Sequence, residues 1–170
     1  MPSKLEIFNL TNAERINNGL PALIYDAYLD ITAQSHNDWM YATGNFSHTG
    51  SGGSSAGDRI KSIGDWGWTG ENIAGGQRSA AEVVTGWMNS PGHRANILRS
   101  SFTHIGLGLT VGNEGYKYYY TQNFGTPNTD FSANPTNPSS TQITLDIPNT
   151  PIAETTSTYS ITPSATTIKE

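Results

Sequence analysis

The sequence WMNSPGHRANIL, residues 87–98, gives the most specific indication of how this chain folds. Before it, Ser79 followed by Glu82 is typical of a capping box, and apolar residues on one face up to Trp87 predict a helix. Pro91-Gly92 should end that helix, because proline breaks the hydrogen bonding of a helix interior. His93 follows at once, so the sequence places it in a loop, where burial gives no reason for an imidazole.

The first predicted helix begins at Ser3, which forms another capping-box pattern with Glu6. Leu5, Phe8 and Ile16 fall within about 80° of one another at ~100° per residue, so we expect them to face the core. Asn18-Gly19 should end this helix.

A second helix is expected after the N-cap residue Asp26, with Gly44 as its C-terminal stop. One face of this helix is apolar except for a single imidazole; it consists of Leu29, Ala33, His36 and Met40. His36 should therefore point inward and be satisfied by a backbone carbonyl or a carboxylate.

Further along, the sequence predicts a short helix over residues 58–63 and then a loop rich in glycine and tryptophan. In that loop we expect Trp66 and Trp68 either to pack beneath it or to offer their indoles to carbohydrate or lipid. Residues 105–111 and 116–124 have strand patterns and predict an antiparallel hairpin. Helices followed by a hairpin indicate the α+β class.

The amino-acid composition limits the kinds of binding partner and metal ligand that this chain can have. The net charge of -5 arises from 14 acidic and 9 basic residues scattered in ones and twos, so nucleic acid is not an expected partner. No apolar run approaches the ~20 residues of a transmembrane helix, and no apolar signal segment is present; we expect that a leader has been removed. With no cysteine in the chain, any metal must be held by His, Asp or Glu.

The composition changes near the end of the chain: 28 of the 45 residues from 126 to 170 are Thr, Ser, Pro or Asn. We therefore expect one domain over residues 1–126 and a linker or tail over residues 127–170. Residues 142–147 alternate polar and apolar side chains as a short strand would, and this strand would pack on the domain or begin a further β-module.

The four histidines are the main candidates for chemistry. We expect His36 and His104, the latter at the start of a strand, to be structural. His48 and His93 occupy loop-like settings, but 45 residues separate them and their spacing does not establish that they are neighbours.

Five segments in one order resemble bacterial members of the CAP superfamily, the SCP-like family of cysteine-rich secretory proteins, antigen 5 and pathogenesis-related 1 proteins. They are residues 12–15 (NAER) with 19–23 (GLPAL), 46–48 (FSH), 70–74 (GENIA), 87–98 and 105–108 (IGLG). The resemblance covers about residues 5–125.

This resemblance implies a three-layer α-β-α sandwich with a central antiparallel sheet, and a cleft lined by His48, Glu71 and His93. Eukaryotic members carry a second cleft glutamate where this chain has Ser90. Glu82 is an alternative candidate for that role, although its position in a capping box favours helix capping. Arg94 and Asn96 are expected to hold the loop through backbone carbonyls.

Family members have been linked to sterol and lipid binding, signalling, defence and occasional proteolysis. We expect an extracellular or cell-surface, monomeric binding module whose cleft accepts a small-molecule, lipid, glycan or peptide ligand. His48 and His93 would bind a divalent cation such as Zn²⁺ weakly, because a third strong ligand is missing.

Two alternatives remain open from the sequence. In the first, the chain is a metal-assisted hydrolase with His48 and His93 as ligands and Glu71 as general base; Glu82 and Ser90 are weaker catalytic candidates. In the second, the domain is a structural part of a larger envelope protein, and the polar residues only fix loop geometry.

Overall fold

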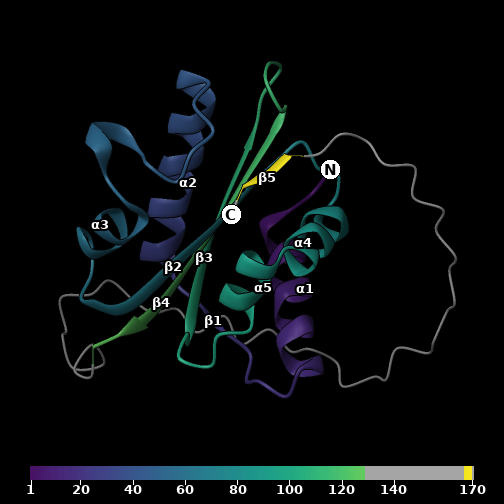
Figure 1. Ribbon diagram of the computed structural model, residues 1–170, viewed down its shortest axis with the longest axis vertical. Helices are drawn as coiled ribbons and strands as arrows, with labels where there is room; N and C mark the ends of the chain where they lie inside the picture. The colour runs from purple at the N-terminus through teal and green to yellow at the C-terminus, as the bar shows by residue number, and fades with distance from the viewer. Residues whose placement is uncertain (129–166, 170) are drawn as a thin grey trace, which may run out of the picture.

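The computed structural model describes residues 1–128 and the strand at residues 167–169 (Figure 1). The strand predicted at residues 142–147 lies outside the described residues. The elements in chain order are α1 (Lys4–Asn17), β1 (Ile24–Tyr25), α2 (Ala27–Thr43), a 3₁₀ turn (Ser51–Gly53), α3 (Ala56–Lys61), β2 (Trp66–Gly75), α4 (Ala80–Asn89), α5 (Pro91–Ile97), β3 (His104–Val111), β4 (Tyr118–Pro127) and β5 (Thr167–Lys169).

The strands form one sheet in the order β1-β3-β4-β2-β5. All pairs are antiparallel except β1 with β3, a two-residue parallel pairing at the edge. Helices α2 and α3 cover one face of the sheet, and α1, α4 and α5 cover the other (Figure 1). The expected α-β-α sandwich is therefore confirmed, with its largest apolar cluster between the sheet and the α1, α4 and α5 layer.

The predicted starts of α1, α2 and α4 are confirmed, because the side chain of each predicted N-cap residue accepts a hydrogen bond from a backbone N–H of its helix. Ser3 and Glu6 form the reciprocal capping box of α1. Asp26 accepts hydrogen bonds from two backbone N–H groups at the start of α2, and Gly44 ends that helix with a φ of 68°. The predicted hairpin is confirmed as well, since β3 and β4 pair antiparallel along their length.

Of the predicted inward face of α1, only Phe8 packs against the core. Leu5 and Ile16 are exposed at 52% and 61%, whereas the buried residues of α1 are Ile7, Thr11, Asn12 and Arg15. Polar residues point inward here because they bind backbone groups of distant loops. The fully buried Arg15 donates to the carbonyls of Pro21, Ile97, Arg99 and Phe102.

The glycine- and tryptophan-rich loop is also corrected, because these residues form the long strand β2. Glycine has a low strand propensity, so the pattern favoured a loop. Gly70 is nevertheless needed in the strand, since a Cβ there would lie 2.7 Å from the ring of Phe102. The two indoles differ: Trp66 is buried and Trp68 is exposed.

Two smaller corrections concern helices. The helix predicted over residues 58–63 begins earlier, after Ser55, whose side chain forms a capping box with Asp58. Pro91 ends α4 but also begins α5, because proline is well suited to the first turn of a helix. His93 is therefore a buried residue of a helix rather than a loop residue.

The buried guanidinium of Arg15 generates a stability prediction. Arg15→Met should lower the free energy of unfolding by at least about 3 kcal/mol, because buried carbonyls lose their charged donor. Arg94→Met, which loses an exposed hydrogen bond to Asn18, should change it by no more than about 0.5 kcal/mol. Urea unfolding followed by circular dichroism measures both, and equal losses would contradict this role of Arg15.

Candidate functional site

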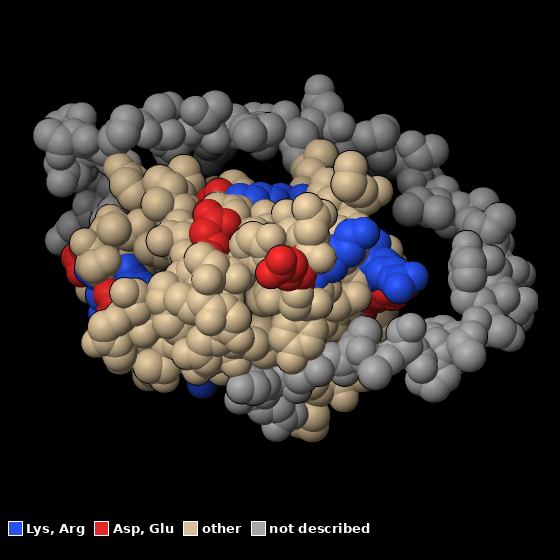
Figure 2. Space-filling model, turned by 90° about the horizontal axis from the view of Figure 1, so that it is seen from above, with Lys and Arg blue, Asp and Glu red and all other residues tan. Residues whose placement is uncertain are grey.

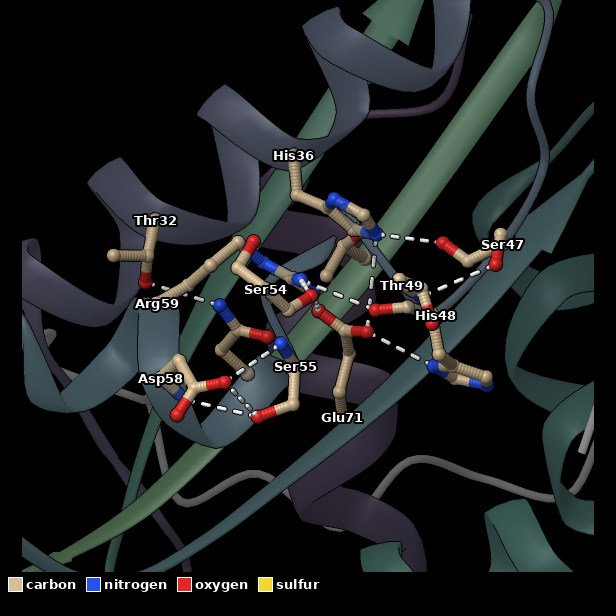
Figure 3. A network of polar contacts seen from close by, with 12 residues as sticks. Thr32, His36, Ser47, His48, Thr49, Ser54, Ser55, Asp58, Arg59 and Glu71 are labelled. Atoms are coloured by element: carbon tan, nitrogen blue, oxygen red, sulfur yellow. Dashed lines mark hydrogen bonds and ion pairs between the residues drawn. The ribbon is translucent and has the colours of Figure 1, made fainter. Parts of the chain in front are cut away.

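A buried carboxylate, that of Glu71 in β2, is the centre of the candidate site (Figure 3). Its side chain is 2% exposed. Oε2 lies 2.6 Å from Nη2 of Arg59, and Oε1 lies 2.9 Å from Nδ1 of His48. The guanidinium balances the charge of the buried carboxylate.

Arg59 reaches this carboxylate from α3 and also fixes the loop that carries His48. Its Nη1 donates to the carbonyls of His48, at 3.1 Å, and Ser54, at 2.9 Å. One side chain thereby joins α3, β2 and the loop before α3. No sequence pattern indicated this role, because Arg59 lies in a short helix next to an ordinary capping residue.

His36 of α2 is the third side chain near the carboxylate. Its Nε2 lies 2.9 Å from the carbonyl oxygen of Ser47 and 3.9 Å from Glu71 Oε1. Because a carbonyl can only accept, the proton is on Nε2. Burial lowers the pKa of His36 below its usual value, and attraction by Glu71 offsets this only in part. The expectation of a core histidine bonded to a carbonyl is confirmed, but its proximity to Glu71 was not foreseen.

Asn123 of β4 completes the surroundings of Glu71. The amide orientation that satisfies its neighbours places its nitrogen 3.2 Å from Glu71 Oε2. Its oxygen then accepts from the Thr32 hydroxyl at 3.0 Å and from the Ala33 N–H at 3.1 Å. Both carboxylate oxygens are thus engaged by donors from the sheet and the helices.

His48 is the exposed member of this network, with 33% of its side chain accessible. Its Nδ1 donates to the Glu71 carboxylate when the ring is neutral, which leaves Nε2 with the lone pair. A carboxylate bound to one ring nitrogen fixes the tautomer and orientation of an imidazole whose other nitrogen binds a ligand or metal.

His93 has different surroundings. Its Nδ1 lies 2.8 Å from the hydroxyl of Ser90, and its carbonyl accepts from the Asn72 amide at 3.1 Å. Neighbouring residues of a strand point to opposite faces, so Asn72 reaches toward α5 while Glu71 points toward α2 and α3. The fold therefore joins His48 with Glu71, and the main chain of His93 lies at the other face of β2.

The remaining candidates are distributed as follows. Glu82 lies at the N-terminus of α4, where its carboxylate accepts from the Arg78 N–H at 2.7 Å. Asn96 donates to the Glu71 carbonyl at 3.2 Å and to the Asn72 side chain at 2.9 Å, as a residue that holds the loop should. Arg94 instead binds the Asn18 side chain.

Within the described residues, no group of three or more His, Asp or Glu side chains is arranged to hold a metal ion.

The sequence matches the model of the CAP family, described as the cysteine-rich secretory protein family, over residues 8–124. This match spans more than half of the chain. The protein therefore belongs to the CAP family.

Two curated relatives come from Bacillus subtilis. The protein YkwD is 44% identical over 104 residues, which are 61% of this chain and 40% of YkwD. The membrane protein YlbC is 37% identical over 123 residues, which are 72% of this chain and 34% of YlbC. The matched part thus spans well under half the length of either relative.

Solved structures share the fold. An extracellular SCP-domain protein from Bacillus anthracis has a TM-score of 0.63 and 36% identity, over 71% of this chain and 39% of that chain. An outer surface protein from Borrelia burgdorferi has a TM-score of 0.69 and 20% identity, over 75% of this chain and 97% of that chain. The second likeness concerns the fold alone.

The ion pair of Glu71 and Arg59 predicts a non-additive mutation cycle. Arg59→Met should lower the free energy of unfolding by about 3–5 kcal/mol, because it leaves a buried carboxylate unpaired. Arg59→Met combined with Glu71→Met should cost less than the sum of the two single changes. Denaturant unfolding of the four proteins measures the coupling, and simple additivity would argue against a buried ion pair.

The buried His36 predicts a pH dependence of stability. Folding lowers the pKa of His36, so the unfolded chain binds the proton more readily than the folded protein. The contribution of the neutral His36 to folding stability is therefore complete above its pKa in the unfolded chain, and it is lost as the pH falls below that value. Between pH 7 and pH 5 the free energy of unfolding should therefore decrease, and His36→Gln should make this decrease shallower. Urea unfolding at several pH values provides the comparison, with His104, whose pKa is also lowered, kept in both proteins.

Proposed function

We propose that this CAP domain is an extracellular binding module and that its ligand contacts the outer edge of the His48 ring. One observation carries this proposal. In the cluster around Glu71, the side chains of His36, Glu71 and Arg59 are 1%, 2% and 13% exposed, whereas that of His48 is 33% exposed. A rigid hydrogen-bonded base that orients a single accessible group is the arrangement of a preorganised binding site.

A divalent cation is the first ligand to consider. The chemistry of the donors fits, because a neutral imidazole with a carboxylate behind it is a common metal ligand. His48 would hold such a cation through Nε2, and the cation would act as a Lewis acid or bridge to a further ligand when bound. The main chain of His93 lies at the other face of β2, so His93 is not proposed as a second ligand, and we expect weak binding.

The relatives support an extracellular location. The Bacillus anthracis protein is described as extracellular and the Borrelia burgdorferi protein as an outer surface protein, whereas YlbC is described as a membrane protein. No helix among residues 1–128 is long and apolar enough to cross a bilayer. In Figure 2 acidic and basic side chains form small separate groups on a mostly uncharged surface.

The alternative, a metal-assisted hydrolase, is favoured by the His48–Glu71 hydrogen bond. A general base must reach water or substrate, however, and the Glu71 carboxylate is buried with both oxygens engaged. We therefore prefer the binding function.

Zinc titration followed by calorimetry and by NMR of the histidine rings tests the proposed site. Zn²⁺ should perturb the His48 ring, and His48→Ala should weaken binding about tenfold or more. His104→Gln is the matched control that should bind as wild type, and so should His93→Ala, since the main chain of His93 lies at the other face of β2. If Zn²⁺ leaves the His48 ring unperturbed and His48→Ala binds as well as wild type, the proposed metal site is wrong, and the hydrolase alternative is excluded with it.

A further inference from the structure

Trp68 lies outside the site described above and has no assigned role. Its indole is 61% exposed, although it belongs to the long strand β2. Side chains alternate along a strand, so Trp68 shares the face of Gly70 and Asn72 toward α5, opposite to Glu71. An apolar ring of this size would contribute about 2–3 kcal/mol of hydrophobic stabilisation if it were buried. Its exposure therefore indicates a function in binding.

A guanidinium lies over this indole in a cation–π contact, which leaves the other ring face to a ligand. The Arg99 side chain lies 5.8 Å from the centroid of the Trp68 ring and 5.4 Å from that of Phe102, a residue that is fully buried. The main chain of Arg99 is fixed as well, because its carbonyl accepts from Arg15 at 3.0 Å and its N–H donates to Asn96 at 3.2 Å. Indole and guanidinium are thus presented in a fixed relation.

The surroundings of Trp68 are polar. Thr126 is its partner across the β2–β4 ladder. Near the start of β2, Asn128 donates to the Asp65 carboxylate at 2.7 Å, and its amide oxygen is close to Gly67. An aromatic plane next to a few hydrogen-bonding groups differs from a protein-binding patch, whose centre is contiguous and apolar.

Addition of a peptide strand at this edge of β2 is not favoured. The carbonyl of Glu71 is already bonded to the Asn96 amide at 3.2 Å, and that of Ile73 to the Trp87 indole at 3.2 Å. A docking strand would have to displace these side chains. The exposed feature is therefore the ring face of Trp68 rather than the strand edge.

We propose that Trp68 and Arg99 form a subsite for a pyranose ring of an oligosaccharide. The C–H groups on one face of a pyranose carry partial positive charge and are attracted to the negative face of an indole. The guanidinium of Arg99 has N–H donors for the hydroxyl or carboxylate oxygens at the rim of the same sugar. This subsite is independent of His48, because it lies on the opposite face of β2.

The test is a titration of the full chain with chitotriose, cellotriose and trigalacturonate, followed by NMR of the tryptophan indole N–H groups. At least one sugar should shift the Trp68 signal, which the Trp68→Phe variant assigns. Trp68→Ala should weaken binding at least tenfold, while Trp68→Phe retains it within about threefold, since the aromatic face remains. Arg99→Met should weaken binding, and Arg94→Met, another arginine from the same region, should not.

Tyr41→Ala removes an exposed aromatic ring from α2, on the other layer, and serves as a second control that should bind as wild type. Circular dichroism and thermal melting verify that each variant is folded. The proposal is overturned if none of the three sugars shifts the Trp68 signal at millimolar concentration, or if Trp68→Ala binds as well as wild type. A Trp68 shift produced only by phosphatidylglycerol vesicles would equally overturn it and assign the indole to a lipid surface.

Discussion

The buried ion pair between Glu71 and Arg59 is the constraint on which the site depends. A carboxylate that is 2% exposed is stable only with a compensating charge and with hydrogen bonds to both oxygens. Those partners come from α2, α3, β4 and the loop that carries His48. Satisfying one buried charge therefore fixes the relative positions of four segments, and the exposed imidazole is positioned as a consequence.

A second polar network does the same for the opposite layer. The Asn72 amide donates to the His93 carbonyl and to Gln122, and Gln122 donates to the Thr11 hydroxyl of α1. Arg15 of α1 binds carbonyls in and after α5. In a chain with no cysteine, these hydrogen bonds connect helices to distant loops where secretory proteins commonly use disulfides.

The alternation of β2 separates two surfaces of different chemistry. Residues at odd positions, such as Glu71, serve the His48 network between the sheet and α2. From Trp68 onward, after the bulge that follows Trp66, residues at even positions such as Trp68 and Asn72 face α5. The proposed His48 site and the proposed Trp68 subsite therefore lie on opposite faces of one strand and can be altered independently.

The sequence by itself determined the caps of α1, α2 and α4, the β3–β4 hairpin and the family, because these depend on local patterns and on ordered motifs. It also predicted a shared cleft for His48, Glu71 and His93, of which the structure joins His48 and Glu71 by a hydrogen bond. It could not determine that polar residues of α1 point inward, that residues 66–75 form a strand, or that Arg59 and His36 join the site. Those features depend on partners that are distant in the chain, such as the carbonyls that bind Arg15 and the aromatic strand β4 that pairs with β2. Only the tertiary structure brings such partners together, since a buried charge or a glycine-rich strand is stable only when its partner is in place.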